Sequence, residues 1–97
     1  MLSANTTKLI SDLAGLEHVP EDTLIREALR ALLMEKKRAI QNDQMDILMR
    51  YRVSSAAALD EEINKGTLPE SPAWEDRIAF DNLQEALRNI DHALASI

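Results

Sequence analysis

Residues 23–53 read TLIREALRALLMEKKRAIQNDQMDILMRYRV and contain neither glycine nor proline. Apolar side chains recur three and four positions apart within this stretch, which predicts one helix. At 1.5 Å per residue such a helix is about 45 Å long, which is longer than a domain of this size is wide. It therefore needs a second long helix, a second chain or a partner protein to cover its apolar stripe.

The composition of the chain favours an all-helical domain. The 97 residues are 45% apolar, with one Trp, one Tyr and one Phe, and they include only two glycines and three prolines. This length suits a single domain spanning residues 1–97 with an aliphatic core. Cysteine is absent, which excludes disulfides and thiolate sites. No apolar run is long enough to cross a membrane, and we expect a cytoplasmic protein.

Capping residues divide the chain into four predicted helices. A polar residue at positions 5–7 would cap the first helix, and Gly15 would end it, because glycine readily adopts a left-handed backbone. A serine at positions 54–55 would begin the third helix, and Gly66 would end it. Ser71 before a proline resembles the start of the fourth. The predicted helices cover about residues 6–14, 22–52, 55–65 and 72–96.

The last helix carries the sharpest periodicity in the sequence. Its apolar residues alternate steps of three and four, which is a heptad pattern, and alanines recur beside them at steps of seven. We therefore predict that it packs nearly antiparallel to the long helix, in the same chain or across a dimer axis. The predicted core or dimer seam consists of Ile25, Leu29, Leu32, Leu33, Phe80, Leu83, Leu87, Ile90 and Leu94.

Candidate catalytic and metal-binding residues are sparse. Asp81 and Glu85 lie four apart, as metal-binding carboxylates on bundles do, but no Glu-x-x-His motif accompanies them. His18 and His92 lack metal-ligand spacing, and no phosphate-binding loop or nucleophile motif is present. We predict no enzymatic activity, no metal and no cofactor.

Charge is distributed unevenly along the chain. Residues 1–50 carry seven Lys/Arg against eight Asp/Glu, and residues 51–97 carry four against nine. An acidic half repels nucleic acid and favours a basic protein partner. We predict that the partner-binding residues are Leu59, Asp60, Glu61, Glu62, Ile63, Leu68, Trp74, Glu75 and Asp76.

Two further features leave alternatives open. Trp74 suits either a core anchor, the favoured role, or a partner-binding hot spot. The one basic cluster is Lys36, Lys37 and Arg38, for which a solvated helix surface is favoured over phosphate contact.

Residues 35–94 resemble the small antitoxins of type II toxin–antitoxin modules. The resemblance rests on the helix EKKRAIQNDQMDILMRYRVS, the short acidic helix DEEINKG, the loop TLPESPAWED and a closing heptad helix. It implies a homodimer whose acidic carboxyl half covers a basic toxin. The segment LISDLAGLEHVPEDTLIREALRALL is similar to the two helices of ribbon-helix-helix DNA-binding proteins, although only Met1 to Asn5 are left to supply the strand of that fold.

The sequence therefore predicts an all-α, dimeric, antitoxin-like interaction module that neutralises a basic partner by occluding it. Two alternatives are a self-associating structural or adaptor bundle and a DNA-binding repressor.

Overall fold

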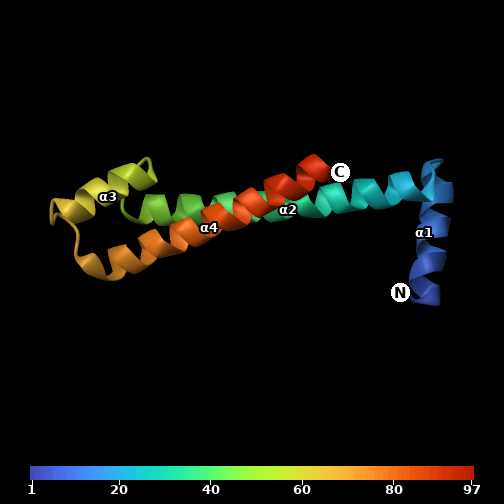
Figure 1. The fold of residues 1–97 in the computed structure, drawn as a ribbon, viewed down its shortest axis with the longest axis horizontal. Helices are drawn as coiled ribbons and strands as arrows, with labels where there is room; N and C mark the ends of the chain where they lie inside the picture. Colours follow the sequence, from blue (N-terminus) through green and yellow to red (C-terminus); the bar gives the residue numbers. More distant parts are fainter.

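All regular structure in the computed structural model, which describes residues 1–97, is helical, as predicted (Figure 1). The chain forms α1 (Ala4–Glu17), α2 (Glu21–Arg50), α3 (Ala56–Asn64) and α4 (Glu70–Ser96). The long helix α2 is continuous over 30 residues, because no glycine or proline interrupts it.

The first helix begins and ends at residues that the sequence analysis did not select. The Ser3 hydroxyl caps it by accepting a hydrogen bond from the Thr6 amide at 3.1 Å, so the helix starts before residues 5–7. Gly15 lies inside the helix, which a single glycine permits. The turn comes at His18, which adopts the left-handed conformation with φ of 57°. The prediction that Gly15 ends this helix was therefore wrong.

The ends of α3 follow the predicted capping residues. The Ser55 hydroxyl accepts a hydrogen bond from the Ala58 amide at 3.0 Å, and Gly66, with φ of 75°, lies in the left-handed region just after the helix. Ser71 has an extended backbone inside the bounds of α4, so the regular part of that helix begins at Pro72, as the sequence indicated.

Helices α2 and α4 form an antiparallel hairpin (Figure 1). The Lys37 ammonium contacts the Asp91 carboxylate at 2.7 Å, and the Gln44 amide donates to the Gln84 side chain at 2.9 Å. Each helix advances seven residues between these pairs, so the contacts repeat with the heptad period. This confirms the prediction that the long helix packs against the carboxyl-terminal helix, here within one chain.

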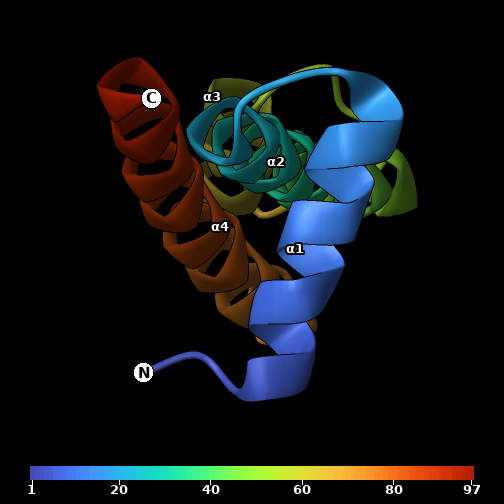
Figure 2. The same ribbon diagram turned by 90° about the vertical axis from the view of Figure 1, so that its right-hand side faces the viewer.

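Helix α4 is too short to cover all of α2. One further heptad step from the Lys37 pair places Arg30 opposite a position just beyond Ile97, the last residue. Residues 21–29 of α2, about 14 Å of helix, therefore extend past the hairpin. Helix α1 turns steeply away from α2 at this end, on the opposite side of the molecule from α3 (Figures 1 and 2).

The resulting molecule is a rod with a thin core. It measures 60 × 21 × 19 Å, and its radius of gyration is 19.8 Å. A compact domain of this length would have a radius of gyration of about 12.5 Å. Only four apolar residues are buried in the chain, and Leu59 is the one large side chain among them; the set is Ala14, Ile47, Leu59 and Ala73.

The predicted seam is divided between the hairpin and the extension of α2. Its hairpin members are half-buried between α2 and α4, and they are Leu33, Phe80, Leu83, Leu87, Ile90 and Leu94. Ile25, Leu29 and Leu32 are instead exposed, at 38%, 46% and 49%. Within one chain these three residues form no core, because α4 ends before it reaches most of that stretch.

Candidate protein-interaction surfaces

One exposed apolar surface is formed by α1 and the first part of α2, which we call the N-terminal arm (residues 4–32). Helix α1 exposes three leucines and α2 exposes three aliphatic residues, and in both helices the spacing is i, i+4, i+7. This spacing places each set on one helix face. The six residues are Leu9, Leu13, Leu16, Ile25, Leu29 and Leu32.

The total surface of the chain shows how much of it lacks a packing partner. The accessible area is 7136 Å². A compact monomer of this mass exposes about 5,600 Å², so the excess is about 1,500 Å² per chain. Monomeric proteins rarely expose contiguous apolar patches above a few hundred Å². The excess belongs to the whole rod. The N-terminal arm contributes apolar area to it, and so do Met34, Met45 and Met49 of α2 and Trp74 and Ile78 of α4.

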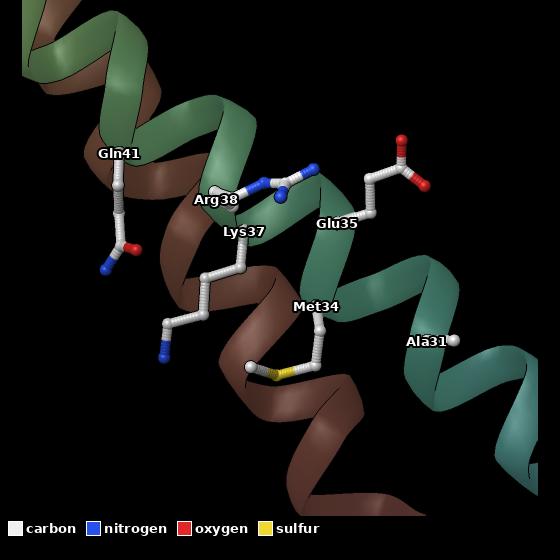
Figure 3. A pocket seen from close by; sticks show the side chains of 6 residues that line it. All are labelled: Ala31, Met34, Glu35, Lys37, Arg38 and Gln41. Atoms are coloured by element: carbon white, nitrogen blue, oxygen red, sulfur yellow. The ribbon is translucent and has the colours of Figure 1, made fainter.

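A shallow groove runs along the middle of α2 beside α4 (Figure 3). Its volume is about 510 Å³, and all six lining side chains come from α2: Ala31, Met34, Glu35, Lys37, Arg38 and Gln41. Lys37 is already paired with Asp91 across the hairpin. Within the predicted basic cluster, Lys37 therefore serves to join α2 to α4. Lys36 and Arg38 are exposed and form no ion pair.

Two of the predicted partner-binding carboxylates join helices within the chain. The Arg77 guanidinium contacts the Asp60 carboxylate at 2.7 Å, which ties α4 to α3. The Asp76 carboxylate accepts hydrogen bonds from Arg50, at 2.9 Å, and from the Tyr51 hydroxyl, which ties α4 to the end of α2.

The pKa shifts in the chain mark these same contacts. The hydrogen bond from Tyr51 is the main cause that lowers the pKa of Asp76 below its ordinary value. Burial, followed by the bond to Asp76, raises the pKa of Tyr51. Hydrogen bonds to Asp76 and to Asp60 raise the pKa values of Arg50 and Arg77, respectively. These shifts therefore belong to hydrogen bonds and ion pairs that hold the helices together.

The other predicted partner-binding residues are distributed between core and surface. Leu59 is completely buried, so it anchors α3 in this conformation. Glu61 pairs with Lys65 one turn along the same helix, and Glu62 accepts a hydrogen bond from the Thr67 hydroxyl. Of the rest, Glu75 is exposed without an ion pair, and Ile63 and Leu68 are half-buried.

Trp74 lies on the surface and not in the core. It is 53% exposed, and Ile78, one turn further along α4, is 47% exposed. The neighbouring Ala73 is the buried residue at this end of α4. The favoured prediction of a core anchor was therefore wrong, because the inward face of α4 begins one residue earlier. Trp74 borders a small groove of about 290 Å³ that is lined also by Asp60, Asn64, Arg77 and Asp81.

Sequence reasoning missed several residues that organise these surfaces. Leu9, Leu13 and Leu16 of α1 were not selected as candidate interface residues, although their spacing matches that of the exposed stripe in α2. Arg77 and Tyr51 were not selected as helix-joining residues. The partners of Arg77 are Asp81, one turn away, and Asp60, which lies 17 positions earlier and which no local pattern connects to it.

The remaining candidate sites have simple structural roles. Asp81 pairs with Arg77, and Glu85 pairs with Arg88. No three His, Asp or Glu side chains converge as metal ligands would. None of the helices combines the length and the apolar character needed to cross a membrane. Residues 1–3, which precede α1, do not form a strand.

Comparison with known proteins identifies the family of the chain but gives no information on its activity. Searches of curated proteins and of solved structures found no match. The profile described as "Uncharacterized protein MJ0235 family" matches residues 1–97, which is the whole chain. The protein therefore belongs to the uncharacterized protein MJ0235 family.

Proposed function

We propose that the protein is a non-enzymatic, self-associating helical interaction module that works as a homodimer. The observation that supports this function is the N-terminal arm, where six large aliphatic side chains at helical spacing remain 38–74% exposed in the single chain. Such a surface is rare on a monomer and common at obligate interfaces.

The amount of uncovered surface matches what a stable dimer buries. If each chain covered its excess of about 1,500 Å², the dimer would bury about 3,000 Å² in total, within the range of obligate homodimers. A domain of this size with one large fully buried side chain also has little core of its own. Association would supply the apolar burial that the single chain lacks.

The polar groups of the protein support a scaffold role more than a catalytic one. The four residues with shifted pKa values all belong to pairs that join one helix to another, and they are Arg50, Tyr51, Asp76 and Arg77. The grooves that border these helices are shallow and surface-exposed.

Sedimentation equilibrium of the intact protein tests the proposal. We expect a mass of about twice 10.9 kDa at micromolar concentration, with a melting temperature that rises with protein concentration. A monomer mass at the highest soluble concentration, together with a melting temperature that does not depend on concentration, would refute self-association.

A second candidate function is binding of a basic partner at the α3–α4 end, as the antitoxin resemblance implies. Trp74 and Ile78 form an exposed apolar pair, and Glu75 beside them carries an unpaired charge. Exposed Trp residues are typical interface hot spots, and an acidic rim suits a basic protein.

The single Trp provides the measurement for this second candidate. The protein would be co-expressed with the product of the adjacent reading frame and then titrated with it. We expect a blue shift of Trp fluorescence on binding and a loss of affinity in Ile78→Ala. Trp74→Phe removes the fluorophore, so its affinity is measured by titration calorimetry, and we expect it to fall as well. Met34→Ala, a change of an equally exposed apolar residue far from this end, is the control. Unchanged affinity in both test variants would exclude this surface.

A further inference from the structure

We infer that a groove between the end of α3 and the start of α4 binds a basic side chain, Lys or Arg, that a partner protein presents. This groove, which we call the Glu70 groove, is lined by Ile63, Asn64, Glu70 and Trp74 and has a volume of about 250 Å³. It lies at the end of the rod where the chain passes from α3 to α4 (Figure 1). The inference rests on the second candidate function, binding of a basic partner at this end, and specifies the group that is recognised.

The four lining residues supply the surfaces that a basic side chain needs. Ile63 and the Trp74 ring are apolar walls for the aliphatic stem, because Lys and Arg bury their methylene groups along apolar surface. The face of a Trp ring also attracts a cation, and the Glu70 carboxylate can accept charge-assisted hydrogen bonds from it. Asn64 adds a neutral amide oxygen. The volume lies below the roughly 300–1,000 Å³ of small-molecule pockets and suits a single side chain.

Glu70 is the one carboxylate that lines a groove with an aromatic ring and forms no ion pair. Residues 56–81 contain seven Asp/Glu and only two Lys/Arg. Both of these cations are engaged, because Lys65 pairs with Glu61 and Arg77 pairs with two aspartates. The Glu70 groove therefore carries an uncompensated negative charge, which a basic side chain would neutralise.

The other surface grooves lack this combination. The groove of about 290 Å³ shares Trp74 and Asn64, but Arg77 within it already binds both of its carboxylates. The groove of about 440 Å³ beside Phe80 has no charged lining residue, and the two remaining grooves, both on α2, have no aromatic one. A basic side chain therefore meets both an aromatic face and an unpaired carboxylate only in the Glu70 groove.

The surface beside the groove favours a side chain presented by a protein over a free amino acid. Trp74 is 53% exposed and Ile78, one turn further along α4, is 47% exposed. A partner that inserts a basic side chain into the groove can cover both with its neighbouring apolar residues, as at an interface hot spot. A free amino acid would leave most of this apolar surface in water.

NMR titration of the isotope-labelled intact protein tests this site with defined probes. The probes are a pentapeptide that alternates Leu and Arg, a pentapeptide that alternates Leu and Glu, and acetyl-arginine amide. We expect the arginine pentapeptide to shift the signals of the Trp74 indole N–H and the Asn64 amides, and the glutamate pentapeptide to leave them in place. Acetyl-arginine amide should bind about 10-fold more weakly than the arginine pentapeptide, because it brings no apolar neighbours.

Three substitutions separate the groove from the acidic surface around it. Glu70→Gln removes the unpaired charge and Trp74→Leu removes the aromatic face, and we expect each to raise the dissociation constant of the arginine pentapeptide about 3-fold or more. Glu75→Gln removes the same charge at a residue outside the groove and is the matched control. All three residues are exposed, so the variants should keep their helix content.

The outcomes distinguish this inference from the candidate function on which it rests. Binding that Glu70→Gln weakens and Glu75→Gln does not, with shifts at Trp74 and Asn64, supports the inference. Equal weakening by Glu70→Gln and Glu75→Gln, or equal affinity for the arginine pentapeptide and acetyl-arginine amide, overturns the inference and leaves a basic partner standing. Equal binding of the arginine and glutamate pentapeptides overturns both. If no signal of the groove shifts at the highest soluble peptide concentration, the inference is overturned.

Discussion

Replacing Leu59 by Ala should release α3 from the rest of the molecule. Leu59 has no exposed surface, and it is the only large side chain that is fully buried. Burial of this kind makes Leu→Ala substitutions cost about 2.7–5.0 kcal/mol. That is a large share of the stability of a domain of this size, which is about 5–15 kcal/mol.

The structure also indicates how the loss of stability in Leu59→Ala is divided between local unfolding of α3 and unfolding of the whole chain. Helix α3 has nine residues and packs against α4, through Leu59 and the Asp60–Arg77 pair. Because so short a helix is unstable alone, it should detach without unfolding of the hairpin. A loss of about 2.7 kcal/mol in the free energy that holds α3 in place corresponds to a roughly 100-fold larger equilibrium constant for the opening of residues 56–64.

Hydrogen exchange measured peptide by peptide checks this prediction. We expect amide exchange in residues 56–64 to accelerate by the stated factor, with little change in the middle of α2. Leu2→Ala is the matched control, because Leu2 is 59% exposed and precedes α1. If Leu59→Ala accelerates exchange less than threefold, or no more than Leu2→Ala does, then Leu59 does not anchor α3.

Three further predictions concern the junction of α2 with α4 and the two glycines. Tyr51→Phe removes the hydroxyl that lowers the pKa of Asp76, and it should reduce the free energy of unfolding at pH 7 by about 1–2 kcal/mol. A carboxyl with a lowered pKa stabilises the fold above its ordinary pKa of 3.8. Denaturant titrations should therefore show the stability difference between wild type and Tyr51→Phe shrinking as pH falls below that value. A constant difference down to pH 2 would contradict the role of Tyr51 in lowering the pKa of Asp76. Gly66→Ala should destabilise by about 1 kcal/mol because φ is 75° there, although a Cβ would meet open space. Gly15→Ala, inside α1 and equally unobstructed, should instead stabilise by about 0.5–1 kcal/mol, and thermal melts that show the same sign for both glycines would contradict the backbone argument.

The sequence by itself determined the helices and much of the hairpin, because those features depend on local rules. A helical period needs only residues three or four apart, and the caps at Ser55 and Gly66 act within one turn. The heptad repeat of α4 likewise identified its packing face before any partner was known. Gly15 shows where such rules fail, since a glycine inside a helix looks in sequence like one at its end.

Only the tertiary structure decided which apolar residues are covered and which charges are already paired. The register of the hairpin, set by contacts such as Lys37 to Asp91 across 54 positions, makes α4 end before it reaches most of the first part of α2. That mismatch exposes the N-terminal arm. In the same way, the sequence indicates that Asp60 and Asp76 are unpaired acidic residues. In the structure, Asp60 is bound by Arg77, and Asp76 is bound by Arg50 and Tyr51. Such contacts depend on distances in space between residues far apart in the chain, which no local pattern encodes.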